Sequence, residues 1–172
     1  MGVVGVSNGW TPSKTASQPT KLTAPGTTAD KLYTVVMTDP DAPSRKEPLF
    51  REFVHWVVHN VPGGGNMAEG GDVAVAYLGP GPPCNSGPHR YVFNIYEQEG
   101  KVETEPAVKA LGDRGGKKTH AFMVDAGLKG PVAAGAYESE WEEFVDGVHT
   151  AIGFLPPPQY RSPKQKADNP EY

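Results

Sequence analysis

The density of glycine and proline limits the fold of this chain more than any other feature of its sequence. Its 172 residues include 21 glycines and 18 prolines, nearly a quarter of the chain. Both residue types interrupt helices, glycine through its large backbone freedom and proline because it lacks the N–H that a helix needs. A helix bundle is therefore excluded, and we expect a single β-rich, loop-rich domain.

Charge and cysteine content exclude several classes of protein. Sixteen basic and twenty acidic side chains give a net charge of −4, so the chain lacks the basic field that holds nucleic acid or an anionic membrane. No apolar run approaches the ~20 residues of a bilayer-spanning helix. Cys84 is the single cysteine, and the N-terminus does not have the pattern of a secretory signal. We expect a reduced, cytoplasmic protein without a disulfide, transmembrane segment or cofactor.

Apolar and β-branched runs bounded by turn residues predict the strands. The clearest lie at Leu32–Thr38, Phe53–Val61, Val73–Leu78 and His89–Tyr96, with two more at Ala121–Val124 and Val132–Tyr137 and weaker ones near Val3–Val6 and Thr20–Thr23. Because these strands do not alternate with helices, they favour a mainly β chain folded as an antiparallel β-sandwich.

Strand periodicity predicts which side chains share a face. Over 53–61, we expect Val54, Trp56 and Val58 on one face, with Phe53, His55, Val57 and His59 on the other. Over 89–96, we expect His89, Tyr91, Phe93 and Ile95 to share a face.

Helices are predicted mainly near the C-terminus. Glu140–Ile152 has an apolar stripe at helical spacing, with Ser139 and Glu142 placed as a capping box. A short helix is expected at Pro106–Leu111. After Leu155 the prolines stop further helix, so we expect a domain over residues 1–153 and a Pro-rich, extended or disordered tail over 154–172.

Two carboxylates follow the first clear strand, in the run Asp39-Pro40-Asp41-Ala42-Pro43-Ser44-Arg45. Prolines hold this turn rigid, so both carboxylates could serve a site. The alternative is purely structural, because Asp before Pro commonly opens a turn and Arg45 could pair with either acid.

His55 and His59 are the next candidates. Four residues apart on a strand they stand ~13 Å from each other, too far to share one metal ion. Each could equally be a core histidine whose hydrogen bonds are satisfied. Asp39, Asp41, His55 and His89 could in principle hold one metal, but their spacing does not favour it over coincidence, so we predict no metal site.

The loop from Gly79 into the strand at His89–Tyr91 is the third candidate. Four prolines stiffen it, while Gly81, Ser86 and Gly87 allow close approach of a ligand, an arrangement typical of an anion cradle. The alternative is an ordinary rigid loop. No motif activates Cys84 or Ser86 as a nucleophile.

Together these segments closely resemble the phosphatidylethanolamine-binding protein family, which includes Raf kinase inhibitor proteins and plant flowering-time regulators. The resemblance is carried by the runs Leu32–Arg45, Arg51–Trp56, Gly81–Pro83 and Gly87–Phe93. It implies a small β-sandwich, N-terminally short here for the family, with an anion-binding pocket at one end. Carried over by motif position, the ligand-binding residues would be Asp39, Pro40, Asp41, His55, Gly81, Pro82, His89 and Tyr91. Phe50 stands where many members have a pocket tyrosine, and His149 where the last helix often brings an aromatic residue.

The resemblance further implies a protein that is not an enzyme. It would bind phosphate or a phosphoethanolamine-type headgroup and regulate a protein partner such as a kinase. Two alternatives stay open: a serine protease inhibitor that acts through a loop or terminus, and a metal-dependent hydrolase built on the Asp/His cluster.

Overall fold

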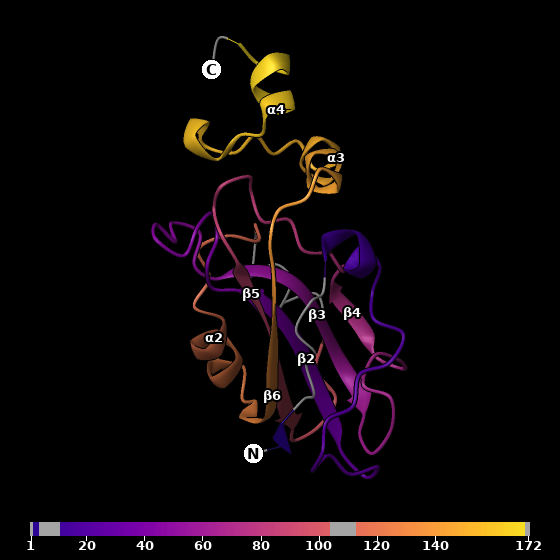
Figure 1. Cartoon of the computed structure of the whole chain (residues 1–172). Coiled ribbons are helices and arrows are strands. Elements are labelled where there is room, and N and C mark those ends of the chain that lie inside the picture. Colours follow the sequence, from indigo (N-terminus) through magenta and orange to yellow (C-terminus); the bar gives the residue numbers. More distant parts are fainter. Residues whose placement is uncertain (1, 4–10, 104–112, 171–172) are drawn as a thin grey trace.

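A computed structural model describes residues 2–3, 11–103 and 113–170 (Figure 1). The strands are β1 (Gly2–Val3), β2 (Leu32–Asp39), β3 (Phe53–Pro62), β4 (Asp72–Val75), β5 (His89–Gln98) and β6 (Lys129–Ser139). The helices are η1 (Pro12–Thr15), α2 (Thr119–Asp125), α3 (Phe144–Ala151), η2 (Pro158–Tyr160) and α4 (Pro163–Asp168).

The strands form one sheet in the order β1-β6-β5-β2-β3-β4. β6, β5, β2, β3 and β4 pair antiparallel, and β1 pairs parallel with β6. The mainly β, antiparallel prediction is thus confirmed. The described residues do not form the predicted two-sheet sandwich. They form one sheet, and loops and a helix cover its faces where a second sheet was expected.

One face of the sheet carries the larger core. Its strands contribute Tyr33, Val35, Met37, Trp56, Val58, Val61, Tyr91, Phe93, Ile95, Ala133 and Tyr137. Leu22 and Ala24, before β2, and Met67 and Ala68, after β3, cover these side chains. The expected strand at Thr20–Thr23 is wrong, because this segment lies over the face as irregular chain.

The opposite face packs against α2. Val36, Val54, Val57 and Tyr96 contact Met123 and Leu128 in a second buried cluster. The strand predicted at Ala121–Val124 is therefore wrong: it is part of α2, and a four-residue apolar run does not distinguish strand from helix.

A β-bulge in β3 changes the predicted faces. Met37 pairs with Trp56 but Thr38 pairs with Val54, so His55 is the extra residue. The bulge places Val54 on the α2 face, opposite Trp56, which corrects the predicted grouping. On β5 the predicted face is confirmed, since Tyr91, Phe93 and Ile95 lie together.

Other boundaries differ from prediction by smaller amounts. β4 ends at Val75, and β6 extends beyond the predicted strand at both ends. The helix predicted at Pro106–Leu111 and most of the strand near Val3–Val6 lie outside the described residues.

α3 begins at Phe144, four residues later than predicted. The proposed capping box is wrong, because Ser139 is the last residue of β6 and no described group bonds its buried hydroxyl. Val145 is fully buried, whereas Phe144 and Ile152 are 43% and 47% exposed, so the predicted apolar stripe is only partly covered.

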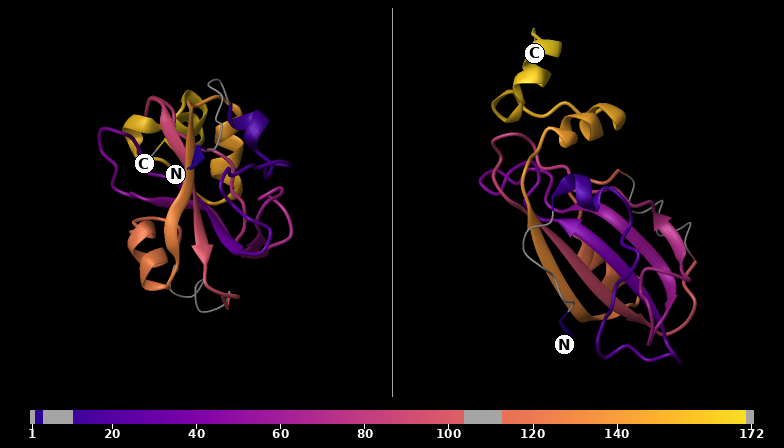
Figure 2. Two further views of the ribbon diagram at one scale, coloured as in Figure 1. Left: turned by 90° about the horizontal axis from the view of Figure 1, so that it is seen from below. Right: turned by 45° about the vertical axis from the view of Figure 1, so that its right-hand side comes forward.

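The chain after Leu155 is more regular than predicted. η2 and α4 follow α3 beyond one end of the sheet (Figure 2). Pro163 occupies the first turn of α4, where a missing N–H does no harm, and Ser162 and Gln165 form a capping box there. No helix among the described residues is long and apolar enough to cross a membrane.

Candidate functional site

A cavity of about 580 Å³ lies where the ends of β2, β3 and β5 meet the loop before β5 and the end of α3. Asp39, Gly81, His55, His89 and Tyr91, all predicted site residues, line it. Apolar residues make up much of the remaining wall: Ala42, Pro43, Phe50, Phe53, Leu78, Pro83, Val148, Ile152 and Phe154.

Asp39 fixes the orientation of His89. Asp39 ends β2 and His89 begins the antiparallel neighbour β5, which places both buried side chains at the same edge of the sheet. His89 Nδ1 donates to Asp39 Oδ2 at 2.7 Å, and Asp41 N donates to Asp39 Oδ1 at 2.7 Å. Asp39 thus holds the His89 ring in one orientation.

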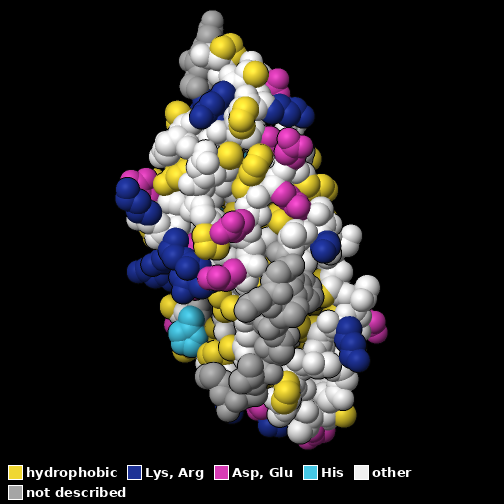
Figure 3. Space-filling view, viewed as in Figure 1, with side chains coloured by type: hydrophobic (Ala, Val, Ile, Leu, Met, Phe, Trp, Pro, Cys, Tyr) yellow, Lys and Arg dark blue, Asp and Glu magenta, His cyan; other side chains and the backbone are white. Residues whose placement is uncertain are grey.

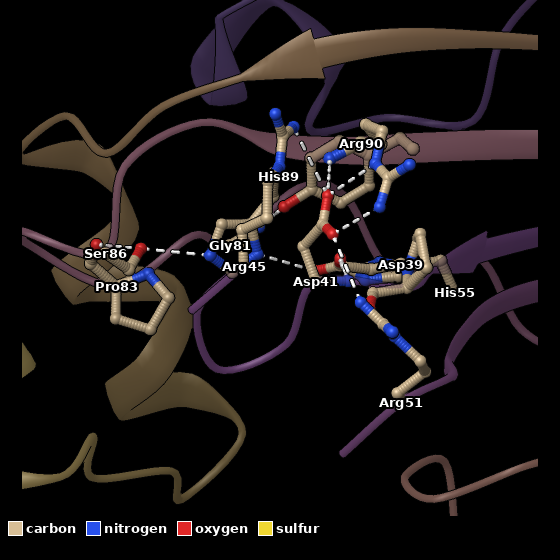
Figure 4. A network of polar contacts seen from close by, with 12 residues as sticks. Asp39, Asp41, Arg45, Arg51, His55, Gly81, Pro83, Ser86, His89 and Arg90 are labelled. Atoms are coloured by element: carbon tan, nitrogen blue, oxygen red, sulfur yellow. Dashed lines mark hydrogen bonds and ion pairs between the residues drawn. The ribbon is translucent and has the colours of Figure 1, made fainter. Parts of the chain in front are cut away.

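The other ring nitrogen of His89 contacts the loop. Its Nε2 lies 3.0 Å from Ser86 Oγ, which also donates to Pro83 O at 2.6 Å (Figure 4). The hydroxyl has one proton, so Ser86 accepts from Nε2 while it donates to Pro83 O, and it must turn away from Pro83 O to donate to Nε2. A ligand oxygen could replace Ser86 as the partner of Nε2 with little rearrangement.

His55 reaches the cavity because of the β3 bulge. Its Nδ1 donates to Leu78 O at 2.8 Å, and no described residue bonds its Nε2. Burial lowers the pKa of His55, an effect that nearby Asp39 opposes. At neutral pH the ring is therefore neutral, and Nε2 is an acceptor until an anion draws a proton onto it.

Tyr91 supplies a hydroxyl donor. Its Oη accepts a hydrogen bond from Gly81 N at 3.2 Å, which leaves its own proton available. Burial raises the pKa of Tyr91 well above its ordinary value, so the phenol stays protonated. The ring packs edge-on against His55, with centroids 5.1 Å apart, and stacks on Tyr137.

Three predicted site residues do not line the cavity. Pro40 and Pro82 are absent from its wall, and the Asp41 carboxylate is buried behind it. Arg90 donates to both oxygens of Asp41, at 2.9 and 2.7 Å. This pairing lowers the pKa of Asp41 to about 2 against the opposing effect of burial, so Asp41 is a structural anion.

Comparison with known proteins matches this geometry to a family. Residues 7–138 match the model of the phosphatidylethanolamine-binding proteins. The chain belongs to this family. The solution structure of a protein designated CG7054 is 35% identical over 87% of this chain and 84% of its own, with a TM-score of 0.66.

Two further structures are similar. A carboxypeptidase Y inhibitor, solved in complex with its cognate proteinase, is 28% identical over 79% of this chain and 76% of its own, with a TM-score of 0.61. A phosphatidylethanolamine-binding protein from Plasmodium vivax, 21% identical over 77% of this chain and 76% of its own, has a TM-score of 0.63 and shows the shared fold.

This family member has a wall residue, Arg114, that sequence reasoning missed. Its guanidinium donates to the carbonyl oxygens of Val54 and His55 at 3.0 Å and of Ala76 at 2.8 Å. Arg114 therefore braces the bulge that carries His55. It stands in a glycine-rich stretch between predicted elements, where the sequence gives no signal of these backbone contacts.

His149, noted from the sequence, does line the cavity. His59 does not, since it bonds Thr34 Oγ1 on the α2 face of the sheet. The described residues hold no group of three or more His, Cys, Asp or Glu side chains that could bind a metal ion. Burial raises the pKa of Cys84, which disfavours a thiolate nucleophile.

Proposed function

We propose that this protein binds the phosphate of a phospholipid headgroup, or a similar organic phosphate, in the cavity without transforming it, and thereby regulates a protein partner. The convergence of His55, His89 and Tyr91 on one cavity supports this most directly. Tyr91 can donate to an oxyanion as it stands, and each histidine can do so once Nε2 is protonated; backbone and carboxylate hydrogen bonds set their positions before any ligand arrives.

Each group would bind phosphate differently. Tyr91 would donate its phenolic proton, and His89, once protonated at Nε2, would exchange Ser86 for a phosphate oxygen. His55 would donate from Nε2 once protonated. Asp39 would not contact phosphate, because two anions repel; its role is to hold His89.

The apolar wall favours an organic phosphate over the inorganic ion. Phe50, Phe53, Ile152 and Phe154 surround the polar groups. An esterified headgroup would place its carbon chain against these side chains and gain from excluding water there. Free phosphate would gain nothing from them.

The test is a heteronuclear NMR titration with O-phosphoethanolamine. We expect shifts confined to the cavity-lining residues, and an affinity about fivefold lower in Tyr91→Phe, which removes one hydroxyl. Tyr96→Phe is the matched control, since Tyr96 Oη bonds His120 on the opposite face. Unchanged spectra, or equal effects of both variants, would refute binding at this cavity.

The similar carboxypeptidase Y inhibitor supports a second candidate, inhibition of a protease. This activity would use a surface loop or terminus and would not depend on the cavity. Hydrolysis by carboxypeptidase Y should then fall as this protein is added, equally for wild type and Tyr91→Phe. No inhibition at micromolar protein would exclude this protease as a target. The metal-dependent hydrolase has no supporting observation among the described residues.

A further inference from the structure

Three arginines surround one buried carboxylate on the outer side of the cavity wall. Arg90 holds Asp41 with Nε and Nη2, while Nη2 of Arg45 lies 3.4 Å and Nη2 of Arg51 3.8 Å from it (Figure 4). Asp41 is fully buried, whereas the three arginine side chains are 44–49% exposed. The guanidiniums are thus gathered at the surface around a hidden anion.

Arg90 alone satisfies Asp41. Its side chain reaches both oxygens, and its backbone N–H donates to Oδ2 at 2.9 Å. Arg45 and Arg51 form ion pairs with Asp41 but no hydrogen bond to it. Arg45 hydrogen-bonds Glu138, and Arg51 Nε donates to Pro40 O. Neither arginine is needed to neutralise the buried carboxylate.

The cluster has unused positive charge and unused donors. Asp41 and Glu138 offset two of the three guanidinium charges. No described residue bonds Nη1 of Arg45, Arg51 or Arg90. Like charges held this close repel each other, and an external oxyanion would relieve the repulsion while accepting from the free N–H groups.

The surroundings favour a peptide as the carrier of that oxyanion. Glu138, the partner of Arg45, also lines a groove of about 330 Å³ with Pro12, Pro88, Trp141 and two further glutamates, Glu140 and Glu142. These carboxylates would repel the continuous negative charge of an anionic lipid surface, whereas a peptide with one phosphate can place neutral or basic neighbours against them. The face drawn in Figure 3 likewise mixes acidic side chains with its basic ones, so it presents no broad basic field.

We infer that Arg45, Arg51 and Arg90 form a recognition site for a phosphorylated segment of a protein partner. A phosphate monoester carries about −1.5 to −2 charges and three acceptor oxygens, which suit clustered guanidiniums. The chain flanking the phosphorylated residue would lie toward the groove at Trp141. This site is independent of the cavity and does not rest on headgroup binding.

The test uses a fluorescent ten-residue peptide with one central phosphoserine and neutral neighbours, measured by anisotropy. We expect the double variant Arg45→Gln/Arg51→Gln to bind it about tenfold more weakly than wild type. The matched control is Lys31→Gln/Lys129→Gln, which removes the same charge from two surface ion pairs, with Glu97 and Glu99. It should bind like wild type, and so should Tyr91→Phe, whose defect is confined to the cavity.

Arg90 is left in place so that Asp41 keeps its partner. If the double variant does not fold, the single variant Arg51→Gln replaces it, with an expected loss of about threefold in peptide affinity. Equal affinity of wild type and the arginine variants would overturn the site. An equal loss of affinity in the lysine control would also overturn it, because the effect would then come from the overall charge of the protein. Equal binding of inorganic phosphate, or binding only to vesicles with 30% phosphatidylserine, would overturn the assignment to a peptide.

Discussion

His149 Nε2 donates a hydrogen bond to the carbonyl oxygen of Gly81 at 2.9 Å, and so joins α3 to the loop that lines the cavity. On its other side, Nδ1 accepts from Gln165 Nε2 of α4 at 3.1 Å. Burial lowers the pKa of His149, which suits a neutral ring with one donor and one acceptor. The imidazole of His149 therefore couples the C-terminal segment to the cavity.

Replacing Gln165 by Leu should disturb the cavity from outside it. The variant removes the hydrogen bond to His149 and half of the capping box of α4, with an expected loss of about 1 kcal/mol in local stability. Amide hydrogen exchange should quicken through α4, and the Gly81 amide resonance should shift.

Lys164→Ala, at an exposed position of the same helix, is the control and should change neither signal. A Gly81 resonance that stays in place in Gln165→Leu would contradict the coupling. Because of the same contact, deletion of residues 155–172 would also disturb the cavity, so this deletion cannot separate protease inhibition by the C-terminal segment from phosphate binding.

Phosphoethanolamine affinity should rise as pH falls from about 8 toward 6. Burial lowers the pKa of free His55, and a bound phosphate would raise it, so binding takes up a proton and lower pH favours the complex. Calorimetric titrations across this range measure the slope. The affinity of His55→Gln should depend less steeply on pH than that of wild type. Because the titration of the ligand itself is the same with both proteins, the difference between the two slopes reports on His55. Parallel slopes would exclude His55 as the proton acceptor.

Asp41→Asn should lower the free energy of unfolding at pH 7 by about 2 kcal/mol. The pKa of Asp41 is about 2 in the folded protein, below the ordinary value of 3.8, so its stabilisation is full above about pH 5 and is lost as the pH falls through 3.8 toward 2. Urea unfolding at pH 7, 4 and 2 should show the gap between variant and wild type closing with acid. Asp113→Asn, at an exposed ion pair with Lys117, should lie within about 0.5 kcal/mol of wild type throughout.

Much of the fold could be predicted because the main strands have strong local signals. β2, β3 and β5 are long β-branched or aromatic runs that end at proline or glycine, and their alternation sets the faces of the sheet. The errors arise where tertiary contacts decide. A short apolar run became helix α2 because Met123 completes the core, and the bulge at His55 depends on pairing with β2.

The candidate site divides in the same way. His55, His89 and Tyr91 could be named from motifs, because residue type and strand position already indicate their chemistry. Asp41 belongs to the same run as Asp39, but it lies behind the cavity wall, where it pairs with Arg90. The sequence does not show this pairing, so it could not separate the two carboxylates. Arg114 acts through backbone carbonyls of three residues far away in the sequence, and such contacts leave no local pattern.

Two glycines of the run after β3 provide the last prediction. A Cβ at Gly63 would overlap the ring of Tyr33, which is fully buried, and the carbonyl oxygen of Thr28, which belongs to the backbone. Neither can move aside easily. Gly63→Ala should therefore lower the free energy of unfolding by about 2 kcal/mol, as overpacking does elsewhere. At Gly65 a Cβ would meet nothing within 4 Å, so Gly65→Ala should change stability by less than about 0.5 kcal/mol. Urea unfolding of the two variants compares the same chemical change two residues apart. If the two variants were equally stable, the chain around Tyr33 and Thr28 would have to relax around the added methyl group. The close packing of this turn would then not stabilise the pairing of β2 with β3.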